Sequence, residues 1–479
     1  MLSNEIGWNF DNTYSNLPES FISKISPVPV KSPELTIFNY NLGEELGLNF
    51  SSIEKNDLSK LFSGNLLPEG SKSIAQAYAG HQFGHFTMLG DGRAVLIGEH
   101  ISKNNERFDI QFKGSGQTPF SRNGDGRAAL GPMLREYIIS EAMHSLNIPT
   151  TRSLAVVKTG EDVVRENILQ GAILTRVASS HLRVGTFQYV AMRNNESELR
   201  TLVDYTINRH YPNIKKSKNK ALDLLKVLIE LQIDLVVNWM RVGFIHGVMN
   251  TDNMTLCGET IDYGPCAFMD TYDPNTVFSS IDHMGRYSYA NQIKIGQWNL
   301  ARFAETLIQF FDNDEDIATK KAKEVIDFFS ETCSNKWLKM MNAKLGLFGS
   351  FLGDDQLVYD LLEWMHINKL DYTNTFLDLS DLEKPSGCLY QDKKFEEWYL
   401  RWQKRLKKNL KPLKSSISLM KSVNPTVIPR NHIVELTLEA AYRPDFKPLL
   451  DLLDVVKKPY SESLLNSSYQ KPPDPSSGI

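Results

Sequence analysis

Hydrophobic and polar residues alternate with a period of two in the first part of the chain. Residues 94–99 and 107–113 both show this pattern, which is typical of β-strands. In the second run the apolar side chains share one face, which leaves Lys113 on the polar face at the end of the strand. The pattern predicts a helix over residues 128–146 and further strands at 154–157 and 172–175.

From about residue 197 the apolar residues recur with a helical period. The run 221–239 is apolar around most of its circumference, so it predicts a central buried helix rather than a surface helix. Helical patterns return at 296–346, 355–370 and 393–412. A β-rich front and a helical back predict an α+β protein with two lobes.

Charge and composition exclude several classes of protein. The chain has 479 residues, enough for more than one core, and its net charge of −4 provides no general positive field for nucleic acid. The basic run 401–421 is interpreted as a solvated helix face. There is no apolar run long enough to span a membrane, no leader pattern and no CxxC spacing among the four cysteines, so we expect a cytoplasmic protein that binds no membrane.

The tetrapeptide Gly-Asp-Gly-Arg occurs twice, at 90–93 and at 124–127. Glycine lets backbone N–H groups approach an anion closely, and arginine supplies a planar charged group, so the pair suits phosphate oxygens. Asp-Gly is also a common turn dipeptide. The repeats therefore indicate either a phosphate site or two ordinary turns.

Lys113 ends its strand and is followed directly by Gly114-Ser115-Gly116. A strand lysine that contacts a nucleotide phosphate usually needs an acidic partner, and the helix over 128–146 offers Glu136 and Glu141. The two carboxylates lie on different sides of that helix, and periodicity alone does not choose between them. A solvent-exposed Lys and Glu are the alternative.

The segment 243–254 is expected to be a loop that carries chemistry. If residues 254–256 and 260–265 form two short antiparallel strands, the hairpin brings Asn253 and Asp262 to the same end. An amide oxygen and a carboxylate are hard ligands that suit Mg²⁺, with phosphates completing its shell. Asp252 can accept a proton from an attacking hydroxyl. A buried polar hairpin without metal is the alternative.

Arg176 and Arg183 follow a predicted strand, and neither belongs to a charge run. They are interpreted either as a clamp on a terminal phosphate or as partners of surface carboxylates. Cys266 lies four residues after Asp262 and is interpreted as a small buried thiol rather than a redox-sensitive one.

Several long strings in this chain resemble the selenoprotein O family. They occupy residues 78–84, 89–94, 111–116, 246–253, 261–265 and 285–287, and read YAGHQFG, LGDGRA, QFKGSG, HGVMNTDN, IDYGP and GRY. The resemblance covers about residues 70 to 310 and is weaker outside them. It implies a protein-kinase-like fold with two lobes. It also implies an enzyme that transfers AMP from ATP to Ser, Thr or Tyr hydroxyls of proteins.

The resemblance also implies roles for individual residues, with ATP bound in reverse so that pyrophosphate leaves. Lys113 would contact phosphate and pair with Glu136, which selects between the two helix carboxylates. Asp252 would accept the proton, and Asn253 and Asp262 would bind Mg²⁺ or Mn²⁺. The remaining ATP-site residues would be Gly90, Gly92, Arg93, Asp125 and Gly126, with Arg176 and Arg183 at the γ-phosphate end.

On this resemblance the chain divides into four regions. Residues 1–70 are an extension packed on the first lobe, and 71–190 form that lobe with the nucleotide-binding elements. Residues 191–430 form the helical lobe with the catalytic and metal-binding loops. Residues 431–479 are a C-terminal segment whose end, 471–479, is expected to be disordered.

Two departures leave alternatives open. The segment His246-Gly247-Val248 has no acid where an ordinary kinase carries its base, so the base is either Asp252 or dispensable. No cysteine follows Cys388, which argues against the terminal redox control found in the family. A γ-phosphoryl kinase, a non-catalytic nucleotide-binding pseudokinase and UMP transfer with Mn²⁺ are the other candidates.

Overall fold

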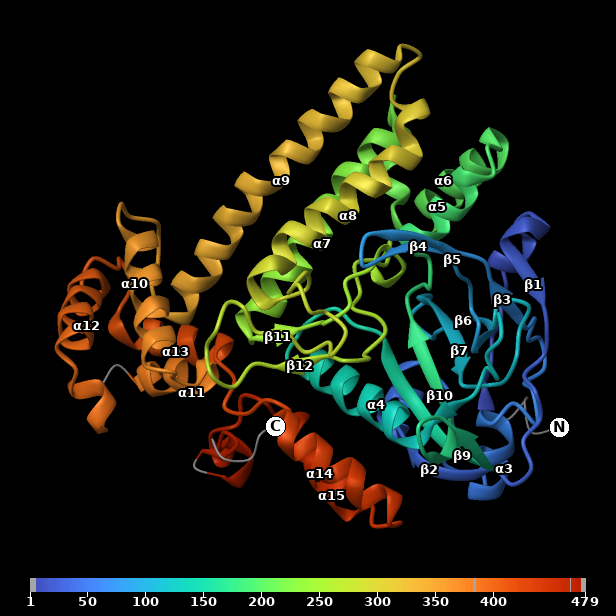
Figure 1. The fold of residues 1–479 in the computed structure, drawn as a ribbon, viewed down its shortest axis with the longest axis horizontal. Coiled ribbons are helices and arrows are strands. Elements are labelled where there is room, and N and C mark those ends of the chain that lie inside the picture. Colours follow the sequence, from blue (N-terminus) through green and yellow to red (C-terminus); the bar gives the residue numbers. More distant parts are fainter. Residues whose placement is uncertain (1–5, 382–384, 466, 475–479) are drawn as a thin grey trace.

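A computed structural model describes residues 6–381, 385–465 and 467–474 (Figure 1). Its β-rich part is an eight-stranded sheet in which every pairing is antiparallel. The strand order is β1-β3-β6-β7-β10-β9-β2, with β8 paired to β10. The strands are β1 (Ile22–Lys24), β2 (Glu34–Phe38), β3 (Ile74–Gln76), β6 (Ala94–Ile101), β7 (Arg107–Lys113), β8 (Ala128–Ala129), β9 (Arg152–Val164) and β10 (Ile168–Ala178).

The four strands predicted from alternation are confirmed as parts of β6, β7, β9 and β10. In the pairing of β7 with β10, Gln111 lies opposite Arg176 and Lys113 lies opposite Leu174. Because side chains alternate between the two faces of a strand, Gln111, Lys113 and Arg176 share one face of the sheet. The polar face predicted for Lys113 therefore belongs to a cluster and not to open solvent.

The helix predicted over 128–146 is confirmed as α4 (Leu130–Ser145), which lies against β9 and β10. Two C-terminal helices, α14 (Asn431–Tyr442) and α15 (Lys447–Val456), also pack on it, and Figure 1 shows them below α4. Gly131 in the first turn of α4 donates its N–H to the Tyr442 hydroxyl (3.0 Å). The helix is thus held between the sheet and the C-terminal segment.

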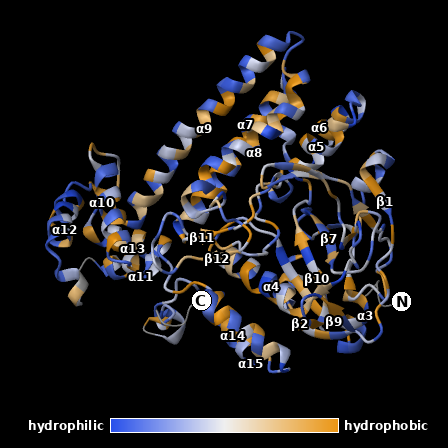
Figure 2. Cartoon of the chain, in the orientation of Figure 1, coloured by the Kyte–Doolittle hydropathy of each residue, from blue (hydrophilic) through white to orange (hydrophobic). Residues whose placement is uncertain are grey.

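The helical part is built around α7 (Lys220–Arg241), which confirms the predicted central helix. Its buried residues contribute to three apolar cores, and it packs on α8 (Gln292–Leu307) and α9 (Glu315–Lys344), which run beside it in Figure 1. Figure 2 shows that apolar positions of these helices turn toward one another. The other helices are α2 (Tyr40–Glu45), α3 (Lys55–Phe62), α5 (Val184–Met192), α6 (Glu196–His210), α10 (Asp354–Ile367), α11 (Tyr372–Asp378), α12 (Lys393–Leu406) and α13 (Leu413–Val423).

Two small two-stranded sheets lie between the large sheet and the helices (Figure 1). One joins β4 (Ala79–Gln82) to β5 (His85–Met88), and the other pairs β11 (Phe244–Ile245) with β12 (Ala267–Phe268). The hairpin predicted from 254–256 and 260–265 is wrong. Thr255 instead bridges to Arg183 and Thr260 to Thr150, so each segment pairs with a different neighbour. A one-turn helix at Thr251–Asn253 precedes them.

Other details of the helical prediction also need correction. The run 296–346 is two helices, α8 and α9, and the basic run 401–421 is divided between α12 and α13. Arg405 in that run is buried and pairs with Asp354 (2.6 Å), so the run is not a uniformly solvated face. The predicted disordered tail lies outside the described residues beyond residue 474.

Within the described ranges, the structure has no helix long and apolar enough to cross a membrane.

Candidate active site

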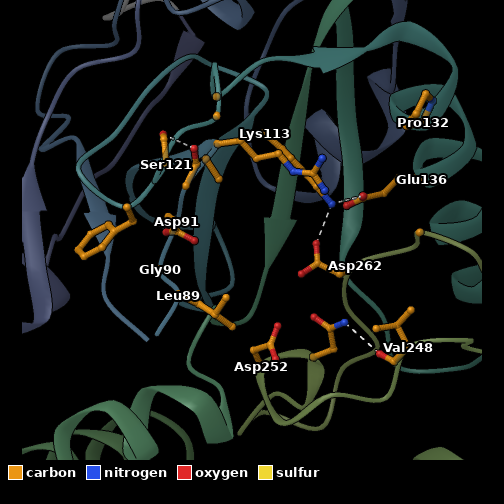
Figure 3. Close-up of a pocket in the computed structure, with 18 of the residues that line it drawn as sticks. Leu89, Gly90, Asp91, Lys113, Ser121, Pro132, Glu136, Val248, Asp252 and Asp262 are labelled. Carbon is orange, nitrogen blue, oxygen red and sulfur yellow. Dashed lines mark hydrogen bonds and ion pairs between the residues drawn. The ribbon is translucent and has the colours of Figure 1, made fainter. Parts of the chain in front are cut away.

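A cavity of about 490 Å³ lies between the sheet, α4 and the loop that follows β11. Of the twelve site residues predicted from the sequence, eleven line it. The twelfth, Arg183, is buried directly behind Asp252 and Asp262, where its Nη1 donates to the Asp252 carbonyl oxygen (3.1 Å). Figure 3 shows Lys113, Glu136 and Asp262 on one side of the cavity, and Asp91 and Gly90 across from them.

Lys113 pairs with Glu136, and not with Glu141. Its Nζ lies 2.6 Å from Glu136 Oε2 and 2.7 Å from Asp262 Oδ1. Glu141 lies away from the cavity, where its carboxylate accepts from Arg152 (2.8 Å) and Asn39 (2.8 Å). Both glutamates are buried, which is why the helical period could not separate them.

Three cations surround the Asp262 carboxylate. Besides Lys113, Arg176 Nη1 lies 2.7 Å from Oδ1 and Arg183 Nη1 lies 3.5 Å from Oδ2. Burial opposes ionisation of this carboxyl, but Lys113, Arg176 and Arg183 hold its pKa well below the usual value. Asp262 is therefore a carboxylate at neutral pH, and both arginines have buried partners rather than the surface carboxylates of the alternative interpretation.

Gln111 joins this cluster and was not predicted. It accepts from Arg176 Nη2 (2.6 Å) and donates to Asp91 Oδ2 (3.3 Å), so it connects the cation cluster to the first Gly-Asp-Gly-Arg segment. Its position on the face of Lys113 was the signal available in the sequence. Tyr78 is a second missed residue, and its ring lies under the Arg183 guanidinium at 4.3 Å from the ring centroid.

Both Gly-Asp-Gly-Arg segments are irregular loop segments with bends, and both line the cavity. A Cβ on Gly90 would lie 2.4 Å from the Phe120 ring, and one on Gly126 would lie 2.1 Å from the Gly116 carbonyl oxygen. Glycine at 90 is thus required for the first loop to approach Phe120, and glycine at 126 for the second loop to fold back on Gly116. The Asp125 carboxylate binds Arg165 Nη1 (2.8 Å) at the edge of the cavity, and the Arg165 contact was not predicted.

Asp252 lies in the one-turn helix and is 6% exposed. Burial raises its pKa to about 6, although Arg183 opposes that shift. Its Oδ1 has no hydrogen-bond partner within the described residues. An unpartnered buried carboxylate oxygen beside the cavity suits a group that receives a proton from a bound molecule.

Two hard oxygen donors face the cavity beside Asp252. The Asn253 amide nitrogen donates to the Val248 carbonyl oxygen (3.0 Å), which leaves its amide oxygen for another partner, and Asp262 Oδ2 has only the distant Arg183 contact. In the part of the chain that the structure describes, no group of three or more His, Cys, Asp or Glu side chains is arranged for a metal. The pair therefore fits a divalent cation that takes its other ligands from a bound phosphate and water.

Cys266 is buried beside the cluster, and burial raises the pKa of its thiol to about 12. The buried-thiol interpretation is supported, because a protonated thiol is a poor nucleophile.

Comparisons with known proteins identify the family of the chain. The family model described as "Protein adenylyltransferase SelO" matches residues 5–457. The chain is 64% identical to a protein nucleotidyltransferase YdiU of Pelagibacter ubique, over 95% of this chain and 94% of that protein. It is 59% identical to the protein of the same description from Nitrosococcus oceani, over 99% of this chain and 97% of that protein.

Proposed function

The chain belongs to the protein adenylyltransferase SelO family, and from that premise we propose that this cavity transfers AMP from ATP to Ser, Thr or Tyr hydroxyls of other proteins. In this reaction the acceptor oxygen forms a bond to the α-phosphorus, the bond from that phosphorus to the β-phosphate bridge breaks, and pyrophosphate leaves.

The observation that supports this proposal most directly is the concentration of buried cations around one carboxylate. Lys113, Arg176 and Arg183 all contact Asp262 at the cavity wall. Cations held in fixed positions away from water stabilise charge that develops on a leaving phosphate far better than mobile surface groups do. We assign Arg176 and Arg183 to the departing pyrophosphate, with ATP reversed relative to ordinary kinases.

Lys113 and Glu136 act as a pair in this proposal. Glu136 also accepts from Arg176 (3.2 Å), so one buried carboxylate orients two of the three cations. A lysine held by a buried carboxylate is fixed in direction, which is what a phosphate contact requires. Gly90, Gly92, Arg93, Asp125 and Gly126 complete the nucleotide site along the opposite wall.

Asp252 receives the proton of the acceptor hydroxyl. Its free Oδ1 and its pKa of about 6 make it a carboxylate at neutral pH that is still basic enough to take a proton as the new bond forms. A loose phosphoryl-transfer transition state places only a modest demand on this base.

Asn253 and Asp262 would hold Mg²⁺ or Mn²⁺ together with ATP phosphates. Such an ion neutralises phosphate charge and fixes the phosphates relative to the acceptor.

The architecture fits a kinase-like fold with two lobes. The sheet with α4 supplies Lys113 and Glu136, whereas the helical part supplies the segment from Asp252 to Asp262. We propose that residues 71–190 and 191–430 are those lobes, with 1–70 and 431–479 as additions to them.

The test is a paired incubation of acceptor proteins with ATP labelled on the α- or the γ-phosphate, with Mg²⁺, for the wild type and Asp262→Ala. We expect protein-bound α-label that is lost in the variant and no γ-label in either sample. Mass analysis of the acceptor then identifies the modified hydroxyl.

Glu141→Gln is the matched control, because it alters a buried carboxylate of α4 outside the cavity. Transfer of γ-label would contradict the proposal and indicate an ordinary kinase. Absence of both labels, with ATP still bound, would indicate a binding protein.

A further inference from the structure

The hairpin of β4 and β5 lies directly on the segment that carries Asp252. It turns through Phe83 and Gly84, which have φ values of 50° and 87°, as a two-residue hairpin turn requires. Gln82 lies opposite His85, and His81 lies opposite Phe86. In such a hairpin the two residues that flank the turn, Gln82 and His85, exchange both backbone hydrogen bonds. The next pair, His81 and Phe86, exchanges none.

This alternation fixes where the backbone groups of β4 point. The His81 N–H points away from β5 and donates to Thr251 Oγ1 (2.7 Å). The Phe83 N–H in the turn likewise donates to Asn250 Oδ1 (3.1 Å). One edge of the hairpin is therefore bonded to Asn250 and Thr251, the two residues directly before Asp252.

The other edge of the hairpin carries the outward backbone groups of Phe86 and Met88. Neither residue's N–H has a partner in any described part of the chain. Both side chains are exposed, at 43% each. Natural proteins usually protect an open edge with Lys, Pro or a bulge, and the sequence His85-Phe86-Thr87-Met88 has none of these devices.

We propose that β5 is the docking strand for the acceptor protein, which adds an extended segment with apolar residues to this edge. The inference rests on the proposed function, because it names the class of protein segment that the enzyme modifies. Main-chain hydrogen bonds give such an interaction its affinity, and alternate side chains give it specificity.

The position of β5 connects this edge to the cavity. Leu89 and Gly90 follow the strand directly and line the cavity wall. A segment that runs beside β5 and continues past Leu89 therefore brings its next residues to the cavity mouth. From Gly84 in the turn to Gly90 at the cavity wall the chain advances six residues, which is at most about 20 Å at about 3.3 Å per residue.

The turn end of the hairpin is positively charged. Arg286 lies beside Gly84, and the guanidinium groups of Arg286 and Arg302 lie over the Trp298 ring at 4.7 and 5.0 Å. Arg302 pairs with Glu305 (2.5 Å), whereas Asp282, the carboxylate nearest Arg286 in sequence, accepts backbone N–H groups. We therefore expect the docked segment to carry an acidic residue about six residues from its hydroxyl.

The first experiment uses synthetic peptides of twelve residues that contain one Ser, Thr or Tyr, alternating apolar residues, and an acidic residue about six positions before or after the hydroxyl. Incorporation of α-label from ATP is measured for the wild type, Met88→Pro and Met88→Ala. The Met88 N–H points away from β4, so proline at this position removes that N–H without removing a hydrogen bond to β4. Edge strands tolerate proline at such a position.

We expect Met88→Pro to lower kcat/KM for the preferred peptide about tenfold, and Met88→Ala about threefold or less. The affinity for ATP is expected to change less than about twofold in both variants. Equal peptide activity in Met88→Pro and the wild type would overturn the docking proposal.

Hydrogen exchange on the wild type provides a test that does not depend on any variant folding. The Phe86 and Met88 amides are expected to become at least about tenfold slower to exchange when the preferred peptide is added, because each would gain a hydrogen bond. Unchanged exchange at both amides would overturn the proposal.

Arg286→Glu tests the charge at the turn. We expect this variant to prefer peptides in which lysine replaces the acidic residue, and the same acidic preference as the wild type would contradict the assigned register.

The proposed function and the docking strand can fail separately. If no peptide accepts label but proteins of a cell extract do, the docking proposal fails and AMP transfer stands. If neither peptides nor proteins accept α-label, the proposed function fails.

Discussion

Asp252 lies between two glycines that leave it almost no free space. A Cβ on Gly80 would lie 2.3 Å from Asp252 Oδ1, and a Cβ on Gly185 would lie 3.2 Å from its Cα and 2.0 Å from the Ala79 carbonyl oxygen. Contacts this short force a neighbour to move. The position of this carboxylate therefore depends on two residues with no side chain of their own.

Gly80→Ala is expected to lower kcat for AMP transfer by about tenfold or more, because a displaced base no longer meets the acceptor hydroxyl. The affinity for ATP should change much less. Kinetics at saturating ATP measure the effect. Gly296→Ala in α8 is the control, since a Cβ there meets its neighbours at ordinary distances of 3.7 and 3.8 Å. Equal loss in both variants would contradict the steric explanation.

Glu259 provides a pH-dependent contribution to stability. Burial raises its pKa to about 7, against hydrogen bonds from Ser179, while Cys257 and Asp109 are the other titratable neighbours. The folded state therefore holds a proton that the unfolded state has released above about pH 4.5. Stability from this group is complete below that pH and is lost as the pH rises to about 7.

Glu259→Gln should remove this dependence. Urea unfolding gives the free energy of unfolding at pH 5 and at pH 8. The decrease between these two pH values is expected to be smaller in the variant than in the wild type by about 1–3 kcal/mol. Parallel pH profiles in the two proteins would contradict the assignment.

At the level of elements, α4 carries two buried carboxylates with different partners. Glu136 faces the cavity and binds Lys113 and Arg176, whereas Glu141 binds Arg152 on the far side. Each is the most buried carboxylate partner of its cation, since the second partners, Asp262 for Lys113 and Glu45 for Arg152, are more exposed. Comparing substitutions of Glu136 and Glu141 therefore distinguishes the effect of losing a buried ion pair on stability from its effect on AMP transfer.

Glu136→Gln and Glu141→Gln are both expected to lower the free energy of unfolding by about 2–4 kcal/mol, because each removes the most buried carboxylate from a buried cation and leaves its charge only partly compensated. Only Glu136→Gln should also lower AMP transfer, by about a hundredfold. Thermal unfolding and α-label transfer on the same samples measure both effects. Similar loss of transfer in both variants would indicate general destabilisation.

The strands and α4 could be predicted because alternation and helical period record which face is buried. The segment after Asn253 could not, because its partners are distant in sequence: Thr255 bridges to Arg183 and Thr260 to Thr150. Local pattern contains no information about such bridges. Asn253 and Asp262 nevertheless line one cavity, although the predicted hairpin does not bring them there.

The partners of charged residues could not be predicted from local sequence either. Resemblance supplied Lys113 with Glu136, but the contact of Arg176 with Gln111 follows only from the register of β7 and β10. Arg405 was interpreted as solvated because its neighbours in sequence are basic, whereas its partner Asp354 begins another helix.

At the level of the whole molecule, the cavity is lined by segments that are distant in sequence, from Tyr78 to Pro265. A ligand bound there contacts the sheet, α4 and the segment from Asp252 to Asp262 together. Ligand binding should therefore stabilise the folded chain as a unit.

ATP with Mg²⁺ at about 100 times its Kd is expected to add about 2.7 kcal/mol to the free energy of unfolding. Removing the metal with a chelator should reduce this gain, and Asp262→Ala should respond less to the metal than the wild type. Thermal unfolding with ATP alone, with ATP and Mg²⁺, and with Mg²⁺ alone measures the difference. An equal response to Mg²⁺ in Asp262→Ala would contradict the assigned ligand.

The position of α4 has a consequence for how such an enzyme is controlled. The helix is held by β9 and β10 on one side and by α14 and α15 on the other, with Gly131 bonded to Tyr442. It has little room to swing outward and separate Glu136 from Lys113. We therefore expect no inactive conformation in which α4 is displaced and the Lys113–Glu136 ion pair is broken. The rate of AMP transfer should then depend on the concentrations of nucleotide and acceptor protein.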